Sequence, residues 1–543
     1  MTEIELRFQI PEPQWAAVHH WVEGDSAAAG TKAHRERLRA SYFDTPARDL
    51  ARAGFALRLR LEGDTWVQTL KGAAPDGMTR LEHNVPVQGD APTLDLTRHA
   101  DHAAGRALQA LLERLDAPAL QALFHTDIER LSRALVTPFG EVELALDRGA
   151  LLAGEGAQQR RLPVAELEIE LKHGDPRAVL EVAREWALGR FGLTLELRTK
   201  ALRGDLLARG EATAPARMSK PAAWRPDHTQ AQALAVLLQA CVEPVLGNAS
   251  QIISGVHQPE HVHQLRVALR RLRVGVDLLC ADAALGKDAT HRVADEDRTA
   301  LRSLGEGARQ LGRALTPARD ADAQRQAHWR PALEAAWQRS ALVSRPDRPA
   351  ASAARSEPPP AALLAQTLWQ DWMLSIIAWL VRGWPVSESM QPVTGEVDRL
   401  ADQALRLARR FDRLDVEGRH HLRRRMRRWK LALEGTAALW ASGEVAPAAR
   451  GRAGKDMPRQ VARLIASIQR MQKPLGDLND LEVAVAAARE ALVRALADGD
   501  AYGAARAGFD LGWLTPVRHE ALARVGRRFK HLKRLKRSRH LPR

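Results

Sequence analysis

The 543-residue sequence contains little cysteine and few aromatic residues. Its two cysteines, Cys241 and Cys280, cannot build a disulfide framework, and their apolar, helix-like surroundings predict reduced thiols in a protein core. Aromatic residues make up 5% of the chain, which argues against a surface that stacks nucleic-acid bases. The most apolar run, Trp372 to Val381, is too short to span a bilayer and predicts a core helix. Because no signal stretch precedes the first predicted strand, a cytoplasmic protein is expected.

Familiar phosphate-binding and zinc-binding motifs are also missing. The sequence has no glycine-rich phosphate loop of the Walker type, and no cysteine or histidine pair stands at zinc-binding spacing. The length and the apolar content (45%) predict two or more domains with sizeable cores. Lysine and arginine number 27 against 31 acidic residues in residues 1–210, but 54 against 35 in residues 211–543. The positive charge therefore belongs to the second part of the chain.

Charged residues alternate with apolar ones in several segments of the first 200 residues. Side chains at every second position share one face of a strand, so Glu3, Glu5 and Arg7 lie opposite Ile4 and Leu6. The same alternation predicts further strands that carry Arg58 and Arg60, Thr69 and Lys71, Glu141, Glu143 and Asp147, and Glu166, Glu168 and Glu170. These segments predict an antiparallel sheet with one polar face.

Two interpretations of this polar face are open. By alternation alone, an antiparallel sheet with a solvated face is favoured. The signs of the charges argue the other way, because some strands carry only arginine or lysine and others only glutamate or aspartate. A site that binds a polyanion through metal ions needs this sorting, since carboxylates hold the cations while guanidinium and ammonium groups hold phosphate oxygens.

Short motifs in these strands resemble the CYTH family of triphosphate tunnel metalloenzymes over about residues 1–205. In the family's order they are Glu3-Ile4-Glu5-Leu6-Arg7-Phe8, Tyr42-Phe43-Asp44-Thr45-Pro46, Ala56-Leu57-Arg58-Leu59-Arg60, Thr69-Leu70-Lys71 and Glu166-Leu167-Glu168-Ile169-Glu170. The resemblance implies an antiparallel β-barrel whose polar strand faces point inward, into a tunnel that takes a triphosphate. It also implies a metal-dependent phosphoric anhydride hydrolase, with Mg²⁺ or Mn²⁺ as the cofactor because oxygen ligands suit these ions.

The resemblance assigns roles residue by residue. Glu3 and Glu5 match the glutamates of an opening Glu-x-Glu-x-Lys motif, and Arg7 stands where the family has lysine. Arginine stays charged and can bind phosphate, but it cannot serve as a tuned proton donor. The implied catalytic residues are Arg7, Lys71 and Lys200, and the implied substrate-binding residues are Arg58, Arg60, Arg80, Arg130 and Arg133. The implied metal ligands are Glu3, Glu5, Glu143, Asp147 and two of Glu166, Glu168 and Glu170.

From Thr229 onward the pattern is helical, and it repeats. Apolar spacing of three and four in stretches rich in alanine, leucine and arginine predicts long helices. The segment from His263 to Arg273 aligns with His420 to Lys430 at a separation of 157 residues, and Ala318 to Asp322 aligns with Leu478 to Glu482 at nearly the same offset. Two landmarks in the same order predict two helical halves related by a pseudo-twofold.

Basic residues share one helix face in both copies of the first landmark. They follow a histidine at spacings of three and four, as His263, Arg266, Arg270 and Arg273 in the first copy and His420, Arg423, Arg427 and Lys430 in the second. A solvated face is the ordinary interpretation of such a helix. Like charges at this spacing nevertheless destabilise an isolated helix, and an anionic partner would relieve the repulsion.

The repeat resembles the CHAD domain over about residues 225–520. The resemblance implies two four-helix bundles that face each other across a basic groove and bind inorganic polyphosphate. The implied binding residues are His263, Arg266, Arg270, Arg273, Arg319, His420, Arg423, Arg427 and Lys430. In the second copy Trp429-Lys430 replaces the usual Arg-Tyr ending, and either His420 or His421 is the motif histidine. Nucleic acid is a less favoured partner, because phosphate contacts alone carry no sequence information and stacking aromatics are sparse.

The expected architecture is an α+β multidomain protein with an N-terminal antiparallel β-barrel and a C-terminal all-α domain. Residues 1–210 are predicted to form the tunnel domain, and the Ala- and Pro-rich residues 211–226 a linker. The helical domain is expected at 227–520, with halves at about 227–340 and 362–520 around a loop at 344–360. Residues 521–543 are expected to form a basic tail.

The expected activity is hydrolysis of inorganic triphosphate to diphosphate and phosphate, because no feature that binds a base or a ribose is visible. Within the CYTH family the alternatives are thiamine triphosphatase, nucleoside triphosphatase and adenylate cyclase. Outside it, the alternative is a non-catalytic phosphate-chain binder that targets the protein to polyphosphate granules. No membrane partner is expected, and the sequence leaves the oligomeric state open.

Overall fold

The computed structural model describes residues 4–24, 32–73, 80–89, 92–116, 119–282, 295–340, 358–382, 394–439 and 457–535. The chain divides into two compact units. Unit 1 comprises Met1–Ala216, Leu246–Gln258 and Ala361–Val381, and unit 2 comprises Arg217–Val245, Pro259–Pro360 and Arg382–Arg543. Each unit therefore combines segments that lie far apart in the sequence, and the predicted domain ranges stay a prediction.

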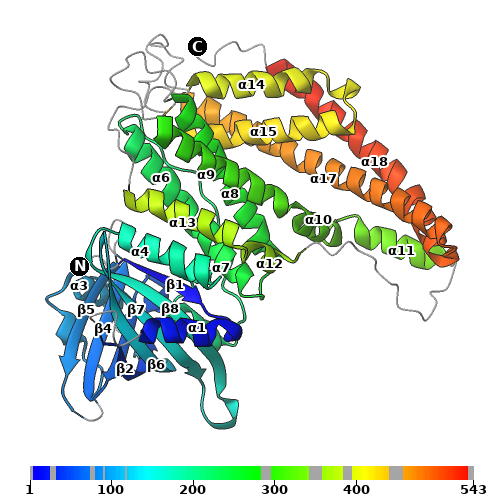
Figure 1. The fold of residues 1–543 in the computed structure, drawn as a ribbon. Coiled ribbons are helices and arrows are strands. Elements are labelled where there is room, and N and C mark those ends of the chain that lie inside the picture. Colours follow the sequence, from blue (N-terminus) through cyan, green and yellow to red (C-terminus); the bar gives the residue numbers. More distant parts are fainter. Residues whose placement is uncertain are drawn as a thin grey trace. The chain divides into compact units, whose positions relative to one another are not determined.

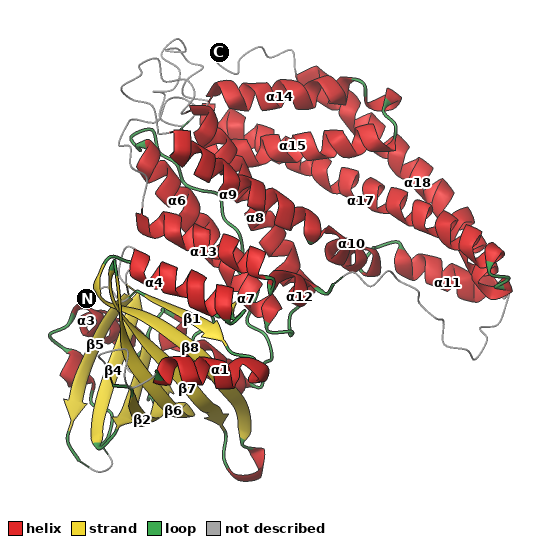
Figure 2. Ribbon diagram, in the orientation of Figure 1, coloured by secondary structure: helices red, strands yellow, loops and turns green. Residues whose placement is uncertain are grey.

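Unit 1 is built on one antiparallel sheet (Figure 1, Figure 2). The sheet has nine strands among the described residues. In sheet order they are β5 (Arg80–Val87), β4 (Thr65–Ala73), β3 (Ala56–Glu62), β2 (His34–Asp44), β6 (Gln121–Thr137), β7 (Gly140–Ala153), β8 (Arg160–Gly174), β1 (Glu5–Gln9) and β9 (Thr194–Leu195). Side chains alternate between two faces, as in β1, where Leu6 and Phe8 are buried and Glu5 and Arg7 lie on the other face. The predicted antiparallel sheet with one polar face is confirmed.

Helices cover the apolar face of the sheet. Leu6, Phe8 and Leu167 share a core cluster with residues of α1 (Glu12–Glu23), α4 (Arg177–Val182), its π-helical continuation η3 (Ala183–Arg190) and α13 (Thr367–Arg382). Farther along the sheet, Leu57 and Leu70 pack with α2 (Asp49–Arg52) and α3 (Ala103–Arg114). Burial of one such side chain contributes about 2 kcal/mol, so the apolar face fixes which way every strand is turned.

Helix α5 (Lys200–Arg209) lies on the polar face. The hydroxyl of Thr199 caps it by accepting a hydrogen bond from the Leu202 N–H (3.1 Å). Leu207 packs with the apolar residues at one end of the polar face, among them Leu38 and Ile128. The helix therefore covers that end, while its first residue, Lys200, reaches the charged part of the face.

The sheet does not close into the barrel expected from the sequence. Its strand order is linear, and within the described residues β5 and β9, at its two ends, do not pair with each other. The backbone N–H of Leu195 on β9 donates instead to the side-chain Oε1 of Gln370 on α13 (2.7 Å). Gln370 is fully buried and donates its own Nε2 to Leu364 O (2.7 Å). At this edge the Gln370 side chain thus accepts the hydrogen bond that a neighbouring strand would otherwise accept. The buried N–H of Leu195 is thereby not left without a partner.

Unit 2 is helical in its described part. Its helices are α6 (Gln230–Val242), α8 (Pro259–Asp282), α9 (Asp295–Ala314), α10 (Thr316–Arg325), α11 (Arg330–Ser340), α14 (Thr394–Arg409), α15 (Val416–Thr436), α17 (Met457–Ala497) and α18 (Ala501–Leu535). Neighbours in the chain pair as α8 with α9, α14 with α15, and α17 with α18 (Figure 1). The helical second part of the chain is confirmed. The predicted tail is helical as far as Leu535, and residues 344–357 of the predicted loop lie outside the described residues.

Several predictions from apolar residues are confirmed. Cys241 and Cys280 are free and buried. The apolar run from Trp372 to Val381 lies in α13, where Leu374 and Ile376 are fully buried. Among the described residues, one helical stretch, Gln230–Ile253, is long and apolar enough to cross a membrane, but 61% of its apolar window is buried inside the protein. A buried core helix passes the same test, so this stretch indicates a membrane span only weakly.

Histidines cluster where β5 meets α3. Nδ1 of His83 lies 2.9 Å from Nδ1 of His99, and the rings of His83 and His102 stack with 4.6 Å between their centroids. The planes of these stacked rings differ by 6°, so one metal ion cannot lie in both ring planes, and the cluster is no metal site as it stands. His99 is fully buried, and its Nε2 has no hydrogen-bond partner.

Replacing His99 by phenylalanine is expected to flatten the pH dependence of unfolding between pH 6.5 and 4. Burial, together with the charges of His83 and His102, lowers the pKa of His99 to about 4. Stability that is present above pH 6.5 is lost as the pH falls toward 4, because the unfolded chain binds a proton that the folded chain refuses. The loss amounts to about 3 kcal/mol. Thermal unfolding from pH 4 to 7 measures it, with the exposed His125→Phe as the control; an unchanged pH slope in His99→Phe would contradict the prediction.

Candidate functional site

Three neighbouring strands, β7, β8 and β1, carry most of the acidic residues of the polar face. In the register of β7, β8 and β1, three rows cross the face: Asp147, Glu166 and Gln9; Ala145, Glu168 and Arg7; and Glu143, Glu170 and Glu5. Directly opposite side chains in antiparallel strands have Cβ atoms about 5 Å apart. The register therefore brings carboxylates of β7 and β8 within reach of one another.

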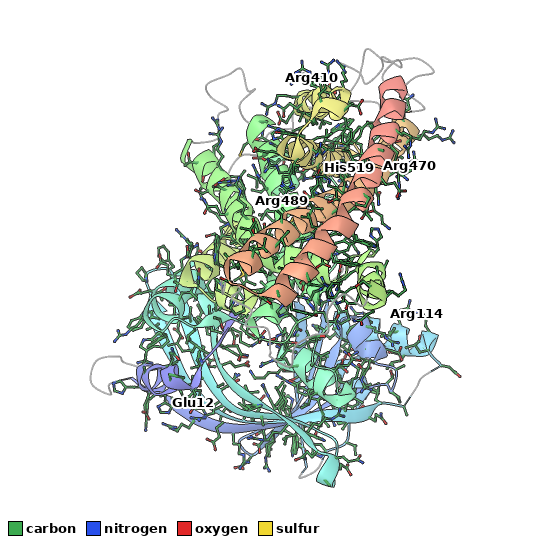
Figure 3. The ribbon with its side chains drawn as sticks, turned by 90° about the vertical axis from the view of Figure 1, so that its right-hand side faces the viewer. Glu12, Arg114, Arg410, Arg470, Arg489 and His519 are labelled. Carbon is green, nitrogen blue, oxygen red and sulfur yellow. The ribbon has the colours of Figure 1, made fainter. Side chains whose placement is uncertain are left out.

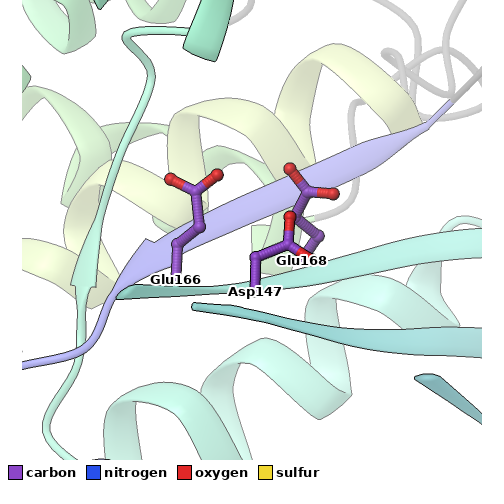
Figure 4. A group of neighbouring side chains, drawn as sticks. All are labelled: Asp147, Glu166 and Glu168. Carbon is purple, nitrogen blue, oxygen red and sulfur yellow. The ribbon is translucent and has the colours of Figure 1, made fainter. Parts of the chain in front are cut away.

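Asp147, Glu166 and Glu168 form the acidic cluster of the polar face (Figure 4). Each offers one oxygen, and these oxygens lie within 4.8 Å of one another. The side chains of Asp147 and Glu166 are 0% exposed, and that of Glu168 is 12% exposed. Buried carboxylates at this distance repel one another, so cations must balance them.

Two arginines on neighbouring strands contact the acidic cluster. Arg130 donates from Nε and Nη2 to the two oxygens of Asp147 (2.7 and 2.8 Å), and from Nη2 to Oε2 of Glu168 (2.5 Å). Arg7 donates from Nε to Oε1 of Glu168 (2.8 Å). The fork of Arg130 thus spans two strands, a geometry that only guanidinium offers.

Helix α5 contributes two more cations. Nζ of Lys200 lies 2.7 Å from Oδ2 of Asp147, and it also forms an ion pair with Glu166. Arg203 follows Lys200 by one helical turn and donates from Nη2 to Oε2 of Glu166 (2.5 Å). Every member of the acidic cluster is therefore paired with at least one cation of the same unit.

The pairing sets the protonation states of the cluster. Burial alone would raise the pKa of Glu168, but Lys200, Arg130 and Arg7 outweigh it and hold this pKa well below its usual range. Burial alone would lower the pKa of Lys200, but the surrounding carboxylates raise it instead. At neutral pH Glu168 is ionised and Lys200 is protonated, so the site offers charged oxygens to a cation and no free amine base.

The next row of acids is more open to solvent. The side chains of Glu5, Glu143 and Glu170 are 20%, 30% and 27% exposed. Nζ of Lys172 lies 3.1 Å from Glu143 and 3.0 Å from Glu170, and Glu5 contacts Arg7. These predicted metal ligands border the acidic cluster, and Lys172 already neutralises two of them.

On the other side of the polar face, strands β3 and β4 carry Arg58, Arg60 and Lys71. Nη1 of Arg58 donates to the Tyr42 hydroxyl (3.2 Å), and Arg60 neighbours Arg58 on β3. The positive charge of Arg130 interacts unfavourably with those of Arg58 and Arg60, so these two arginines lie near the residues around the acidic cluster. Nζ of Lys71 on β4 forms an ion pair with Oε2 of Glu82 on β5 (2.7 Å).

Not every predicted residue joins this site. Arg133 is three positions from Arg130 on β6, so strand alternation turns it to the apolar face, where its Nη2 donates to Trp21 O (2.8 Å). Glu3 and the side chain of Arg80 lie outside the described residues. The roles of these three residues stay predictions.

Other residues of the site were missed from the sequence, although signals for them exist. Arg203 stands one helical turn after Lys200, and recognising α5 would have put both on one face. Glu196 lies in Thr194-Leu195-Glu196-Leu197-Arg198, which shows the same alternation as the strands that were recognised. The short length of β9 concealed that signal.

The acidic cluster fits a divalent metal ion. Its donors are carboxylate oxygens that are close together and, for Glu168, firmly ionised. Mg²⁺ and Mn²⁺ prefer oxygen ligands of this kind. In the part of the chain that the structure describes, no other group of three or more histidine, cysteine, aspartate or glutamate side chains is so arranged. Which of the two ions binds stays a prediction.

The basic repeat forms an arginine cluster in unit 2, made of Arg266 and Arg270 on α8, Arg319 on α10, and Arg423 and Arg427 on α15. Burial and the charges of Arg266, Arg423 and Arg319 lower the pKa of Arg270 to about 9. Burial and the other four arginines lower the pKa of Arg427 well below its usual range. These side chains stay charged at pH 7 but repel one another.

Few acids balance the arginine cluster. Nη1 of Arg319 lies 3.2 Å from Asp320 and 3.8 Å from Asp480. Within the ranges that the structure describes, no acidic side chain lies within 4.0 Å of the guanidinium groups of Arg270 or Arg427. The centre of the cluster is therefore positive and half-buried, the arrangement that a multiply charged anion would stabilise.

The other predicted polyphosphate ligands are divided. Arg273 forms an ion pair with Asp277 (3.7 Å), and Lys430 forms one with Glu434 (3.0 Å). Both residues therefore have acidic partners of their own. Nδ1 of His420 lies 2.8 Å from Oδ1 of Asn479. The charges of Arg270, Arg319 and Arg427 disfavour protonation of His263, which shows that His263 lies beside the arginine cluster.

Many other basic residues of unit 2 are simply solvated. Figure 3 labels Arg470 and Arg489 on α17 and His519 on α18, and all three are exposed. Such side chains contribute little energy individually. The arginine cluster differs from them by its burial and by the convergence of three helices.

Known families match both parts of the chain. The model of the CYTH domain matches residues 1–200, and the model of the CHAD domain matches residues 236–489. The chain carries a CYTH domain followed by a CHAD domain. Both resemblances drawn from the motifs are thereby confirmed, and the acidic cluster lies in the CYTH part while the arginine cluster lies in the CHAD part.

The chain is similar to a curated protein, the inorganic triphosphatase of Haemophilus influenzae, with 30% identity over 217 residues. The match covers 38% of this chain and 55% of that protein, so the chain spans about half the length of the curated relative. Among solved structures, the CHAD domain of the plant Ricinus communis gives a TM-score of 0.41 at 22% identity, covering 59% of this chain and 97% of that one. A Pyrococcus horikoshii protein gives 0.24 at 21% identity, covering 38% and 99%. At these TM-scores neither likeness carries an argument.

Proposed function

We propose that the CYTH domain hydrolyses inorganic triphosphate to diphosphate and phosphate with a divalent metal ion, and that the CHAD domain binds inorganic polyphosphate. The observation that carries the first part is the buried acidic cluster of Asp147, Glu166 and Glu168, interleaved with arginine and lysine on one sheet face. The similarity of the chain to an inorganic triphosphatase supports the same activity.

The acidic cluster would hold the metal ion, with Glu5 one row away. Bound there, Mg²⁺ or Mn²⁺ would neutralise phosphate charge and lower the pKa of a bound water. Glu168 is kept ionised by its cationic neighbours, so its oxygens remain available as ligands well below neutral pH. Asp147 and Glu166 are buried, so their own carboxylate oxygens are shielded from solvent.

Arg7, Arg130 and Lys200 would bind phosphate oxygens. Each of them pairs with a carboxylate of the acidic cluster in the structure. A divalent cation on those carboxylates would release these side chains toward a triphosphate, so metal and substrate are expected to bind cooperatively. Lys200 is protonated and Arg7 stays charged, so both stabilise developing charge on oxygen and neither abstracts a proton.

The aromatic surroundings favour inorganic triphosphate over a nucleotide or a thiamine ester. Tyr42 and Phe124, on the polar face beside Arg58, stack on each other with 4.5 Å between ring centroids. They are 7% and 3% exposed. Rings buried against each other leave little surface on which a base or thiazole ring could stack.

The arginine cluster supports polyphosphate binding by the CHAD domain. Arg270 and Arg427 repel each other and lack close acids within the described residues. A phosphate chain carries a negative charge on every unit and accepts bidentate hydrogen bonds from guanidinium groups. It would thus relieve the repulsion that the folded protein maintains.

Phosphate release from tripolyphosphate, ATP, thiamine triphosphate and long-chain polyphosphate tests the catalytic proposal. With Mg²⁺ or Mn²⁺, turnover of tripolyphosphate is expected to exceed that of the other substrates by at least about tenfold, a difference of about 1.4 kcal/mol in transition-state binding. EDTA is expected to abolish it. No metal-dependent turnover of any substrate would refute the hydrolase, and faster turnover of ATP would point to a nucleoside triphosphatase.

A further inference from the structure

The buried residue Glu196 lies on the polar sheet face but has no role in the reaction outlined above. Leu195 pairs with Phe8 in the β9–β1 ladder, and the N–H of Glu196 donates to Arg7 O (2.7 Å). Glu196 therefore stands opposite Arg7 and extends the row of Glu168 and Arg7 by one position. Its side chain is 1% exposed.

The carboxylate of Glu196 joins three segments of the chain. Oε2 accepts hydrogen bonds from Nε2 of Gln9 (3.0 Å) and Nη2 of Arg198 (2.7 Å). Oε1 accepts from the backbone N and Nε of Arg198 (2.9 and 3.0 Å) and from the hydroxyl of Ser250 (2.5 Å). Glu196 thereby links strand β1 to helix α7 (Asn248–Ile253), which follows 52 positions later in the chain.

Side chains from the CHAD part of the sequence complete this edge of the sheet. The hydroxyl of Ser250 accepts a hydrogen bond from the Leu197 N–H (3.1 Å), and Oε1 of Gln370 accepts one from the Leu195 N–H (2.7 Å). Ser250 is 3% exposed and Gln370 is 0% exposed. Both residues lie within the range 236–489 matched by the CHAD domain, yet both belong to the compact unit of the sheet.

We propose that Glu196 is a positioning residue for the triphosphate site, and that Ser250 and Gln370 from the CHAD part of the sequence hold it in place. The inference rests on the proposed function of the CYTH domain. Strand β9 has two residues, too few for ladder hydrogen bonds alone to order the edge of the sheet. The side-chain hydrogen bonds of Ser250 and Gln370 fix this edge of the sheet. The backbone hydrogen bond from Glu196 to Arg7 O then fixes the position of β1.

The consequence concerns the rows that hold the acidic cluster. Arg7 stands opposite Glu168 and Gln9 stands opposite Glu166. If Glu196 loses its partners, β1 gains freedom at both positions, and the oxygens of the acidic cluster lose their fixed neighbours. Residues that orient metal ligands in this way typically contribute 10- to 100-fold in affinity or activity. The catalytic unit thus includes helices α7 and α13, which a cut after residue 210 would remove.

Full-length Glu196→Gln and Ser250→Ala test the inference, with Ser254→Ala as the matched control. Ser254 follows α7 and donates to Gln251 O (2.6 Å) within its own turn. Titration with Mn²⁺ followed by electron paramagnetic resonance is expected to show affinity weakened about tenfold in Glu196→Gln and Ser250→Ala, but within twofold of wild type in Ser254→Ala. The KM for tripolyphosphate is expected to rise in parallel. Ser250→Thr, which keeps the hydroxyl, is expected to restore the affinity.

A role limited to folding would give a different result. It would lower the unfolding temperature and the amount of active protein, but leave KM and the Mn²⁺ affinity of the folded molecules unchanged; that result would overturn the inference. If the wild type binds Mn²⁺ but hydrolyses no triphosphate, the proposed function fails while the titrations still decide the role of Glu196. If the wild type binds no Mn²⁺, both are refuted.

Discussion

Replacement of Glu168 by glutamine is expected to slow tripolyphosphate hydrolysis by about 100- to 1000-fold. Glu168 accepts hydrogen bonds from Arg7 (2.8 Å) and Arg130 (2.5 Å), and its oxygens lie in the acidic cluster with those of Asp147 and Glu166. Glutamine keeps the size of the side chain but removes a charge that would hold the metal ion. It also leaves guanidinium groups without the anion that orients them.

The rate is measured as phosphate release at saturating Mg²⁺, with Glu129→Gln as the control. Glu129 is adjacent to Arg130 on β6 but exposed, on the opposite face of the sheet, so its variant is expected to stay within twofold of wild type. Thermal unfolding of both variants separates a lost charge from a lost fold. A folded Glu168→Gln protein that retains a third of the wild-type rate would show that the acidic cluster is not the catalytic centre.

Strand periodicity is sufficient to predict the polar face and most of its residues. Glu166 and Glu168 alternate with apolar residues, as do Arg58 and Arg60, and the structure places all four on that face. Alternation does not reveal the register between strands. That Asp147 stands opposite Glu166, one row from Glu168, depends on pairing between β7 and β8, and so the members of the acidic cluster could not be chosen from the sequence.

The edge of the sheet could not be predicted for a different reason. Closure into a barrel was expected, but Leu195 finds its partner in Gln370, 175 positions away. Gln370 stands next to Trp369 in a run whose apolar residues indicate only a core helix. A buried polar side chain in such a run must have a partner, but only the fold identifies it. The placement of Arg133 on the apolar face, in contrast, follows from its odd spacing to Arg130 and was open to prediction.

In the CHAD domain, Arg270→Met combined with Arg427→Met is expected to weaken polyphosphate binding by about 100-fold and, at the same time, to stabilise the protein. Each guanidinium–phosphate contact that is lost is expected to cost about 1.4 kcal/mol, which is a tenfold factor in affinity, so the loss of two contacts gives the expected effect. Binding of labelled long-chain polyphosphate at fixed salt measures the loss, because such affinities depend steeply on ionic strength.

The gain in stability has its origin in the repulsion within the arginine cluster. Burial and neighbouring arginines lower the pKa of both Arg270 and Arg427, which means that the folded state disfavours their charges. Replacing buried charges by apolar side chains of similar length is often stabilising by about 1–4 kcal/mol. Thermal unfolding without polyphosphate is therefore expected to shift upward by several degrees.

Arg424→Met is the matched control, because Arg424 is exposed on the same helix, α15, between Arg423 and Arg425. It is expected to change neither binding nor unfolding temperature appreciably. Reduced binding together with reduced stability in the double variant would mean that the arginines support the fold itself. Opposite changes would show that the protein keeps an unfavourable concentration of charge whose benefit appears only with an anion bound, and competition with random DNA of equal charge then distinguishes polyphosphate from polyanions in general.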